Sequence, residues 1–468
     1  MRILVAIANY GSKNSAYLSR LIDEYRAMSY EVHIVVLSNV LKDLGPDIEV
    51  AVGLPAKDPW SLPFAHKAMF AERVGDYDLF IYSEDDTLVT QRNIDAFLKV
   101  TELLPEDEIA GFLRYEQDGE GRKYCCTIHA HFHWRPSSAR RVKGYAFAEL
   151  TNAHSACYIL TRAQLLKAIN SGGYLVGPHQ EHYDLLCTAA TDPYTQCGLT
   201  KVVCISHIED FLLHHLPNLY VEQRGILVSE MKAQIDALLA VGDGQEMQKE
   251  LFVPVTGLGV FAWDKLYYEE CRDDVLALVP KHSQNVLSVG CGWGATEAKL
   301  VENGVRVVGV PLDPIIAVSA RSRGVDVLVP DLARARESLD GEKFDCILFV
   351  DVLGRLRDPQ KILGEYATLL DERGCAVITA HNFRYLGNLP KMLAKRRLCR
   401  GFDGARIHFT ASGMLARWIR QSGLNVYDVG YRLGRRAKWI SRASLGLMNR
   451  YVARELVLVA GKDHRRVR

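Results

Sequence analysis

Three adjacent carboxylates follow an apolar segment early in the chain. The stretch DLFIYSEDDTLVT, residues 78–90, runs through Leu-Phe-Ile-Tyr and one serine into Glu84, Asp85 and Asp86. In an open α/β sheet, ligands bind beyond the carboxyl ends of the strands, where these side chains would lie. Crowded carboxylates become favourable there when Mg²⁺ or Mn²⁺ neutralises them, and such a cation usually also binds substrate phosphates. The cluster therefore predicts a metal–diphosphate site.

Capping of a helix is the alternative explanation of this acidic cluster. Acidic side chains ahead of a helix are stabilised by its dipole. The segment TLVTQ, residues 87–91, separates the three carboxylates from the next helical pattern. This separation favours the metal site over the capping role.

A glycine-rich turn is the second feature that could do chemistry. Residues 284–304, QNVLSVGCGWGATEAKLVENG, place Gly290, Gly292 and Gly294 between an apolar strand pattern and a helical pattern. Glycine lets the backbone turn tightly and approach a ligand closely, and a helix N-terminus offers free N–H groups. The spacing alone is weak evidence, but a second apolar strand, VRVVGV, follows the helix. The segment therefore predicts a ligand-binding turn.

The segments that must position the acidic cluster alternate between strand and helix patterns. Short apolar runs lie on either side of segments in which apolar residues have helical spacing. The expected strands are 2–11, 31–39, 78–84, 155–162 and 201–208, and the expected helices are 15–29, 93–105 and 161–173. This alternation predicts an α/β fold with a mainly parallel sheet and helices on its faces.

A second α/β series occupies the other half of the chain. An amphipathic helix, 228–244, ends in glycine and is followed by a loop-like stretch with Pro and Gly. Since 468 residues exceed what one core usually supports, two or three domains are expected from length. We predict a first domain over residues 1–225, a helical linker over 226–255 and a second domain over 256–468. The strands expected in the second domain are 284–294, 305–313, 325–331, 344–353 and 374–382.

Composition limits the class of protein. With 48% hydrophobic and 24% charged residues, the chain has an ordinary globular composition. No apolar run approaches the ~18–20 residues of a membrane span. The apolar start is too short for a signal peptide, and eleven scattered cysteines without a CxxC pair indicate reduced thiols. We therefore expect a cytoplasmic protein.

Charge is distributed unevenly along the chain. Residues 384–468 carry 20 Lys and Arg against 4 Asp and Glu, whereas the remainder carries 37 against 52. A basic end of this size could face an anionic substrate or a membrane surface. The inner face of the membrane is thus a second expected location. A solvated domain face is the alternative explanation.

The first half of the chain resembles the GT-A class of glycosyltransferases, over roughly Met1 to Tyr220. The resemblance lies in the first strand with its NYG turn, in PWSLPFAHKAMFAERVGDYDLFIYSEDD and in NAHSACYILTR. In that class a DXD-type motif holds a divalent metal on the diphosphate of a nucleotide sugar. The resemblance implies that Glu84, Asp85 and Asp86 bind Mn²⁺ or Mg²⁺, with Glu84 departing from the strict first aspartate.

The same resemblance implies a late histidine on the metal and a carboxylate base. The candidates lie in GPHQEHYDLL and ISHIEDFLLHHLPNLY. Glu181 or Asp184 would deprotonate an acceptor hydroxyl. His215 or His207 would complete the metal shell. A surface or capping role is the alternative for each of these residues.

The second half resembles class I S-adenosylmethionine-dependent methyltransferases, over about Tyr267 to Val459. Gly290, Gly292 and Gly294 match the cofactor loop of that family, and Asp331 matches the acid near the adenine. The segment FDCILFVDVLGRLRDPQKILGEYATLLDERGCAVITAHNF matches the fourth strand, the next helix and the fifth strand. ARIHFTASGMLARWIRQSGLNV is similar to relatives that modify bacterial surface glycans. The resemblance implies a Rossmann-like, seven-stranded domain that binds S-adenosylmethionine.

Two cofactor positions depart from the family pattern. Ser288 stands in the usual acidic position ahead of the glycines, and Pro311 stands where an acid normally receives the ribose hydroxyls. Asp313, two residues on, could replace that acid. A lost charge-assisted hydrogen bond costs roughly 1.5–3 kcal/mol, or about tenfold to a hundredfold in affinity.

The catalytic positions of the second half are less defined. Gly354 and Arg355 replace the common Glu-His pair after the fourth strand. Methyl transfer needs little beyond alignment of a nucleophile, so no catalytic base is obvious. His408 and His381 are the candidates, and a structural role is the alternative for both.

Together the two resemblances predict a bifunctional enzyme of surface polysaccharide biosynthesis. It would transfer sugar from a nucleotide-sugar donor and methylate the same glycan or lipid-linked glycan, at a raised effective concentration. One alternative is a methyltransferase whose first domain binds a glycan or nucleotide without turnover. Others are a glycosyltransferase with a degenerate methyltransferase scaffold, and a scaffold without catalysis. No nucleic acid partner is expected, because no aromatic-basic reader motif appears.

Overall fold

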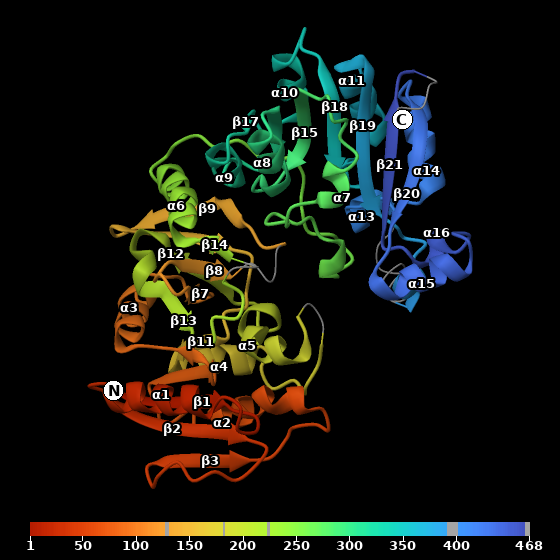
Figure 1. Ribbon diagram of the computed structural model, residues 1–468. Coiled ribbons are helices and arrows are strands. Elements are labelled where there is room, and N and C mark those ends of the chain that lie inside the picture. Colours follow the sequence, from red (N-terminus) through yellow and green to blue (C-terminus); the bar gives the residue numbers. More distant parts are fainter. Residues whose placement is uncertain (127–130, 181–182, 222–224, 391–400, 464–468) are drawn as a thin grey trace. The chain divides into compact units, whose positions relative to one another are not determined.

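The computed structural model describes residues 1–468 except 127–130, 181–182, 222–224, 391–400 and 464–468 (Figure 1). The chain divides into two compact units, Met1–Glu246 (unit 1) and Met247–Arg468 (unit 2). Each unit has its own sheet system. Among the residues that the structure describes, no helix has the length and apolarity needed to cross a membrane.

The first sheet of unit 1 positions the acidic cluster. Its strand order is β11-β4-β1-β2-β3, in which four strands are parallel and β11 runs antiparallel to β4. The central strands β1 and β4 are almost wholly buried, as expected of parallel strands covered on both faces. The strands are β1 (Arg2–Ala8), β2 (Glu31–Ser38), β3 (Ile48–Val52), β4 (Leu79–Glu84) and β11 (Cys157–Thr161).

Two smaller sheets complete unit 1, with strand orders β6-β12-β10-β9 and β14-β8-β7-β13-β5. Most of their neighbouring strands are antiparallel, so the mainly parallel sheet predicted for this half describes only its first sheet. Their strands are β5 (Thr87–Leu88), β6 (Glu108–Ala110), β7 (Leu113–Gln117), β8 (Lys123–Cys126), β9 (Trp134–Val142), β10 (Tyr145–Leu150), β12 (Thr200–Cys204), β13 (Leu212–His215) and β14 (Gly225–Leu227).

The helices of unit 1 include one that we expected in a linker. Helix α6 (Val228–Gly242) packs on β9, with the indole of Trp134 donating to the sulfur of Met231 over 3.4 Å. It belongs to unit 1 because its buried face, including Ile235 and Leu238, completes that core. The other helices are α1 (Ser15–Arg26), α2 (Ala65–Glu72), α3 (Gln91–Thr101), α4 (Arg162–Asn170) and α5 (Leu185–Thr195).

Unit 2 is built on one seven-stranded sheet of order β17-β16-β15-β18-β19-β21-β20. The first five strands are parallel, and β21 is antiparallel to both of its neighbours. This sheet confirms the Rossmann-like, seven-stranded prediction. The strands are β15 (Asn285–Cys291), β16 (Arg306–Pro311), β17 (Asp326–Val327), β18 (Phe344–Val350), β19 (Leu370–His381), β20 (Asn425–Arg432) and β21 (Glu455–Gly461).

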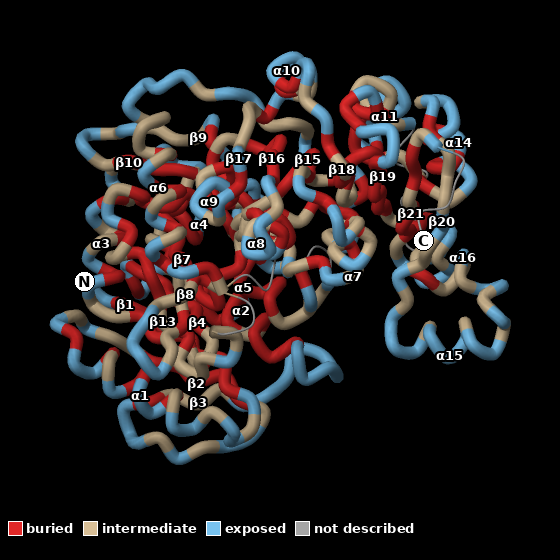
Figure 2. The backbone as a smooth tube through the Cα atoms, turned by 45° about the horizontal axis from the view of Figure 1, so that its top comes forward, coloured by how far each residue is buried: buried red, intermediate tan, exposed pale blue. Residues whose placement is uncertain are grey.

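Helices cover both faces of this sheet, and the strands between them are the most buried part of the unit (Figure 2). Between α11 and α14, Leu363, Leu415 and Ile419 join the core formed by the strands. The helices are α7 (Asp273–Leu276), α8 (Ala295–Glu302), α9 (Ile316–Ser322), α10 (Leu332–Ser338), α11 (Pro359–Ala367), α13 (Gly401–Ala405), α14 (Ser412–Gln421), α15 (Arg435–Ala443) and α16 (Asn449–Val452).

Candidate functional site

The acidic cluster of unit 1 lies where the strand order reverses. Strand β1 lies between β2 and β4, and Ala8 pairs with Glu84 at the carboxyl ends of β1 and β4. In open α/β sheets, ligands bind beyond the carboxyl ends of the strands at such a reversal of strand order. The carboxylates therefore stand at the position that the sequence predicted.

Asp85 is held by two amides. Its carboxylate accepts hydrogen bonds from the side chains of Asn9, at the end of β1, and Asn14, the latter at 2.8 Å. Burial raises the pKa of Asp85 to about 6, although both hydrogen bonds act in the opposite direction. Asp85 therefore fixes the β1–α1 turn to the end of β4.

Asp86 pairs with a histidine from another sheet. Strand β13 pairs antiparallel with β5, which brings the imidazole of His215 within 3.5 Å of Asp86. The other ring nitrogen of His215 lies 2.5 Å from Glu116. Burial lowers the pKa of His215, but the hydrogen bonds with Asp86 and Glu116 outweigh it and raise that pKa. The histidine is thereby stabilised as a cation between two carboxylates.

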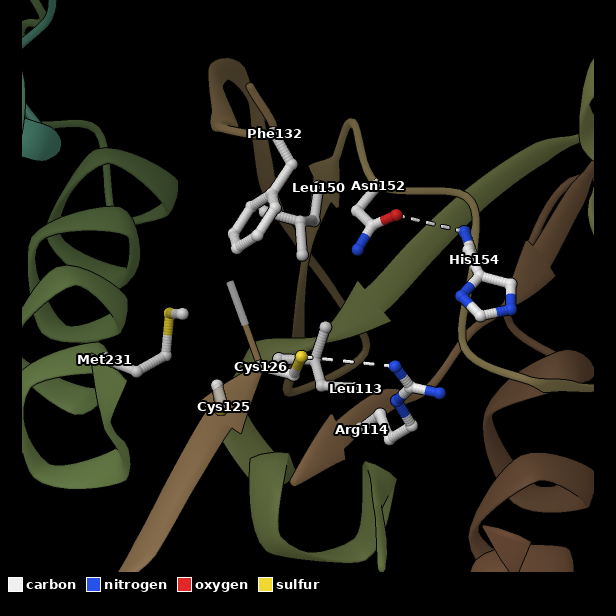
Figure 3. A pocket seen from close by; sticks show the side chains of 9 residues that line it. All are labelled: Leu113, Arg114, Cys125, Cys126, Phe132, Leu150, Asn152, His154 and Met231. Carbon is white, nitrogen blue, oxygen red and sulfur yellow. Dashed lines mark hydrogen bonds between the residues drawn. The ribbon is translucent and has the colours of Figure 1, made fainter. Parts of the chain in front are cut away.

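Glu84 lies near the cation Arg114, a histidine whose pKa is lowered by burial, and further acids. His154 is 3.5 Å from its carboxylate, and Arg114 interacts with it electrostatically. Figure 3 shows Arg114 and His154 at a small cavity of about 30 Å³, which has room for water but not for a substrate. Burial and the nearby Asp86 raise the pKa of Glu84 to about 7. Glu84 is consequently a group that exchanges a proton near neutral pH.

The predicted metal site is not formed by the described residues. No three His, Cys, Asp or Glu side chains among them are grouped as a cation requires. Consecutive residues at a strand end point to different sides, so Glu84, Asp85 and Asp86 meet different partners. In this structure the three carboxylates contact amide, histidine and arginine side chains, and His215 bridges Asp86 and Glu116.

The remaining residues predicted for this site, two candidate bases and one further metal ligand, have different surroundings. Asp184 accepts a hydrogen bond from the backbone of Cys187 over 2.9 Å as the N-cap of α5, and it also interacts electrostatically with Glu84. Glu181 lies outside the described residues. His207 contacts Ser206 and the ring of Tyr145, away from the acidic cluster.

Sequence reasoning missed five residues of this site, namely Asn9, Asn14, Arg114, Glu116 and His154. One signal was available, because Arg114 and Glu116 lie in a short strand next to apolar residues, where an unpaired charge is unfavourable. Their partners are far away in sequence, so the sequence did not indicate which groups would neutralise them.

The glycine turn of unit 2 joins β15 to α8 as predicted. Gly290 and Gly294 have φ angles of +78° and +85°, in the left-handed region that favours glycine. A Cβ atom on Gly290 would lie 2.4 Å from the side chain of Val352, and one on Gly292 would lie 2.3 Å from the carbonyl oxygen of Tyr267. Close approach of the chain to itself therefore requires these glycines.

A strap, defined as residues 250–272, brings Tyr267 to this turn. Its backbone accepts two hydrogen bonds from Trp293, at Tyr267 from the amide over 3.0 Å and at Glu269 from the indole over 2.6 Å. The amide of Leu251 donates to the carbonyl of Leu312, just after β16. The strap thus crosses the carboxyl ends of β16 and β15.

Replacing Gly292 with alanine is expected to destabilise unit 2 by about 1–3 kcal/mol, because the new methyl group would displace the Tyr267 carbonyl. Urea unfolding of the full chain measures the loss. Gly413→Ala is the matched control, since nothing lies within 4 Å of a Cβ at that helical position. If the two variants unfold at the same urea concentration, the contact between the strap and the glycine turn does not stabilise unit 2.

Asp313 and Asp331, the two acids predicted to bind the cofactor, both accept hydrogen bonds from nearby backbone groups in this structure. Asp313 is 1% exposed and accepts hydrogen bonds from the backbones of Ile315 and Ile316, at 2.7 and 2.8 Å. Burial raises its pKa to about 7, and the hydroxyl of Tyr267 also interacts with it. Asp331 is exposed and caps α10.

The acid missing at Ser288 is supplied by the next helix. The hydroxyl of Ser288 donates to the carboxylate of Glu297 over 2.6 Å, and both side chains are buried. Glu297 lies in the first turn of α8, directly after the glycine turn. A carboxylate is therefore present beside β15. Because it comes from α8, comparing the sequence with the family pattern position by position does not find it.

A cavity of about 190 Å³ lies at the carboxyl ends of β18 and β19. At its wall, Asp351 accepts a 2.6 Å hydrogen bond from Arg355, and His381 lies 3.5 Å from Asp351 and 3.2 Å from Arg355. Burial raises the pKa of Asp351, but Arg355 and His381 outweigh it and hold that pKa below its usual range. The lining residues are Phe261, Ala262, Asp264, Lys265, Leu266, Glu269, Arg272, Asp351, His381, Arg432 and Glu455.

His381, and not His408, lies in this cavity. The ring of His408 is 3.0 Å from the carbonyl of Leu356 and lies between Phe402 and Trp418. Burial lowers the pKa of His408. These contacts pack His408 between neighbouring side chains in this structure, and its catalytic role stays a prediction.

The central part of unit 2 is similar to known methyltransferases. Residues 263–429 match the family model described as "Methyltransferase domain". The ubiquinone biosynthesis O-methyltransferase of Colwellia psychrerythraea is 24% identical over 156 residues, which cover 31% of this chain and 63% of that protein. The chain thus spans less than two thirds of the curated relative that it matches.

Solved structures of low identity also align with the chain. A SAM-dependent methyltransferase from Archaeoglobus fulgidus is 14% identical, with coverage of 40% of this chain and 89% of that one and a TM-score of 0.32. A TehB-like SAM-dependent methyltransferase from Corynebacterium glutamicum is 20% identical, with coverage of 50% and 98% and a TM-score of 0.29.

Proposed function

Because residues 263–429 form a class I S-adenosylmethionine-dependent methyltransferase domain, we propose that this protein methylates an acceptor hydroxyl bound at the ends of β18 and β19. The observation that supports this most is the cavity in which His381 and Asp351 lie together. The choice of oxygen follows the curated relative, which is an O-methyltransferase.

The residues around this cavity fit S-adenosylmethionine in chemical type. Its amino acid end carries an ammonium and a carboxylate, and the wall offers carboxylates at Asp351 and Glu269 and cations at Lys265 and Arg272. Asp313 would accept the ribose hydroxyls. When bound, the cofactor supplies a methyl group from its sulfonium.

The volume of the cavity indicates that the strap must move for binding. Ligand pockets usually measure roughly 300–1,000 Å³, and this one measures about 190 Å³. The hydroxyl of Tyr267 would leave Asp313, and the carbonyl of Tyr267 would leave Trp293. Strap opening is therefore part of the proposal.

His381 is the proposed proton acceptor. Its ring lines the cavity, and the contacts with Asp351 and Arg355 would orient it. General base catalysis of this kind usually contributes about 10²–10⁴-fold. The chain thus replaces the common Glu-His pair with an Asp-Arg-His arrangement.

For unit 1 we propose binding of a nucleotide sugar or glycan at the crevice beside Glu84. The reversal of strand order and the proton-exchanging carboxylates support this role. Sugar transfer is the second candidate function, because Asp184 lies near Glu84 and could serve as a base. A divalent cation would then arrive with the diphosphate.

Titration of the full chain with S-adenosylhomocysteine tests the methyltransferase proposal. We expect saturable heat in the parent, and we expect His381→Ala to retain this binding while losing methyl transfer to glycan acceptors. Lys281→Ala, at an exposed residue, is the control. No binding by a folded chain would support the degenerate scaffold instead.

Incubation with UDP or a nucleotide sugar, with and without Mn²⁺, distinguishes the two functions proposed for unit 1. Binding without donor hydrolysis supports a binding domain, whereas release of free sugar from a nucleotide sugar supports transfer. If neither ligand binds, the role proposed for the acidic cluster is wrong.

A further inference from the structure

The C-terminal part of unit 2 carries an exposed helical tip, defined as residues 435–450. It contains α15, the start of α16 and the turn between them (Figure 1). Large apolar side chains are exposed there, with 75% exposure at Trp439, 91% at Leu445 and 79% at Leu447, and Ile440 and Met448 are exposed as well. Single exposed apolar residues are normal, but a group of this density marks an interaction surface.

The tip packs with its small residues inward. In α15, Ala437 and Ser441 are partly buried, whereas Trp439 and Ile440, which lie between them in sequence, are exposed. A helix that packs on a core normally turns its large apolar face inward. The orientation of α15 is the reverse, so the exposed face is available to a partner.

The neighbouring segment enlarges this face. The short helix η5 (Leu386–Asn388) packs against α16, and Leu386 and Leu389 are about half exposed. Asn382 fixes the arrangement by donating a 2.9 Å hydrogen bond to the carbonyl of Arg450. The apolar surface therefore involves two segments of the chain, and the hydrogen bond from Asn382 ties it to the end of β19.

The same surface is strongly basic. Between Asp428 and Glu455 the sequence contains seven Lys and Arg residues and no acid. Among the described residues, no ion pair involves the five tip cations, all of which are exposed: Arg435, Arg436, Lys438, Arg442 and Arg450. Exposed aromatic and aliphatic side chains surrounded by unpaired cations match the interface of an anionic bilayer.

We propose that the helical tip binds the surface of a membrane rich in anionic phospholipid. Trp439, Leu445 and Leu447 insert among the headgroups, and the surrounding arginines and lysine contact lipid phosphates. The charge argues against a second copy as the occupant, because two such tips would repel each other. This inference is independent of the reaction proposed above, since it involves none of the cavity residues.

Sedimentation of the full chain with vesicles tests the proposal. We expect the parent to bind vesicles of equal phosphatidylcholine and phosphatidylglycerol, and to bind pure phosphatidylcholine at least about tenfold more weakly. Added salt weakens the binding to anionic vesicles. A blue shift in tryptophan emission on binding, absent in Trp439→Phe, places that ring in the interface.

Two variants separate the apolar and electrostatic contributions. Arg435→Glu with Lys438→Glu is expected to weaken binding by more than about tenfold, and Trp439→Ser, Leu445→Ser and Leu447→Ser together are expected to abolish it. Lys281→Glu with Arg334→Glu is the matched charge control, and Leu41→Ser is the matched apolar control, since both alter exposed residues elsewhere.

Three results would overturn the proposal. One is equal affinity for neutral and anionic vesicles, and another is undiminished binding by either tip variant. The third is a dimer of the parent, formed without lipid and lost in the apolar triple variant, which would assign the tip to a second copy. Circular dichroism confirms that each variant is folded before binding is compared.

Discussion

Asp351→Ala is expected to lower the free energy of unfolding of unit 2 by about 3–5 kcal/mol. The side chain of Arg355 is 1% exposed, and Asp351 is its carboxylate partner at 2.6 Å. Truncating Asp351 leaves the buried guanidinium hydrogen-bonded to backbone carbonyls and to the ring of His381, with Asp264 as a remaining carboxylate that interacts with it electrostatically. Breaking a buried pair in this way leaves a charge without its hydrogen-bonded carboxylate, which is more costly than never having had the pair.

Urea unfolding, in which the two units are expected to give separate transitions, measures this loss. A double variant, Asp351→Leu with Arg355→Met, is expected to recover part of the stability because no buried charge remains. Asp403→Ala is the control, since it removes the exposed carboxylate that pairs with Arg357. If Asp351→Ala and Asp403→Ala unfold at the same urea concentration, the buried pair does not stabilise unit 2.

The effect of Asp351→Ala depends on pH in a defined direction. The pKa of Asp351 is lower in the folded chain than its usual value of 3.8, so its contribution is present above pH 3.8 and is lost as the pH falls further. The difference in stability between parent and variant is therefore constant near neutral pH and shrinks only in strong acid. Unfolding at pH 7 and pH 3 is the check.

Glu84→Gln is expected to make unit 1 more stable at pH 8, by up to about 3 kcal/mol. Folding raises the pKa of Glu84 from 4.5 to about 7, so the folded state favours the protonated form. Stability from this group is fully present below pH 4.5 and is lost as the pH rises through about 7. Glutamine keeps the shape of the protonated acid at every pH and removes the loss.

Thermal unfolding at pH 5 and pH 8 measures this difference. The parent should lose stability in unit 1 over that interval, whereas Glu84→Gln should lose less. Asp43→Asn, at an exposed residue, should follow the parent. The same pH dependence in parent and Glu84→Gln would contradict the prediction.

Glu84→Gln also tests the proposed role of the acidic cluster. A site that keeps an unfavourable charge for binding should gain stability and lose affinity when that charge is removed. We therefore expect weaker UDP binding by the more stable variant. Unchanged UDP affinity would assign Glu84 a structural role only.

The sequence predicted the central strands because their residues are continuously apolar. β1, β4, β15 and β18 are buried on both faces, so their pattern does not depend on distant partners. Strands such as β9, WRPSSARRV, carry polar and charged residues and take shape only by pairing with β10. Local patterns do not reveal such pairings.

The candidate sites, too, were predictable where they depend on local sequence and not where they depend on distant residues. The position of Glu84–Asp86 followed from an apolar strand that ends in acids, and the glycine turn followed from its strand–helix context. The groups that balance the acids come from far along the chain, such as Glu116, which meets His215 across 99 positions. The occupation of the glycine turn by Tyr267 depends on the path of an irregular segment, which carries no periodic signal.

The strap also determines how unit 2 could be excised. The matched family region begins at residue 263, but Leu251 and Phe252 pack against the buried cluster around β15 and β18. A fragment starting at residue 263 would leave that apolar surface, and the carbonyl of Leu312, open to water. A fragment of unit 2 that folds independently must therefore start upstream of Glu250. The folding domain thus begins before the region that matches the methyltransferase family.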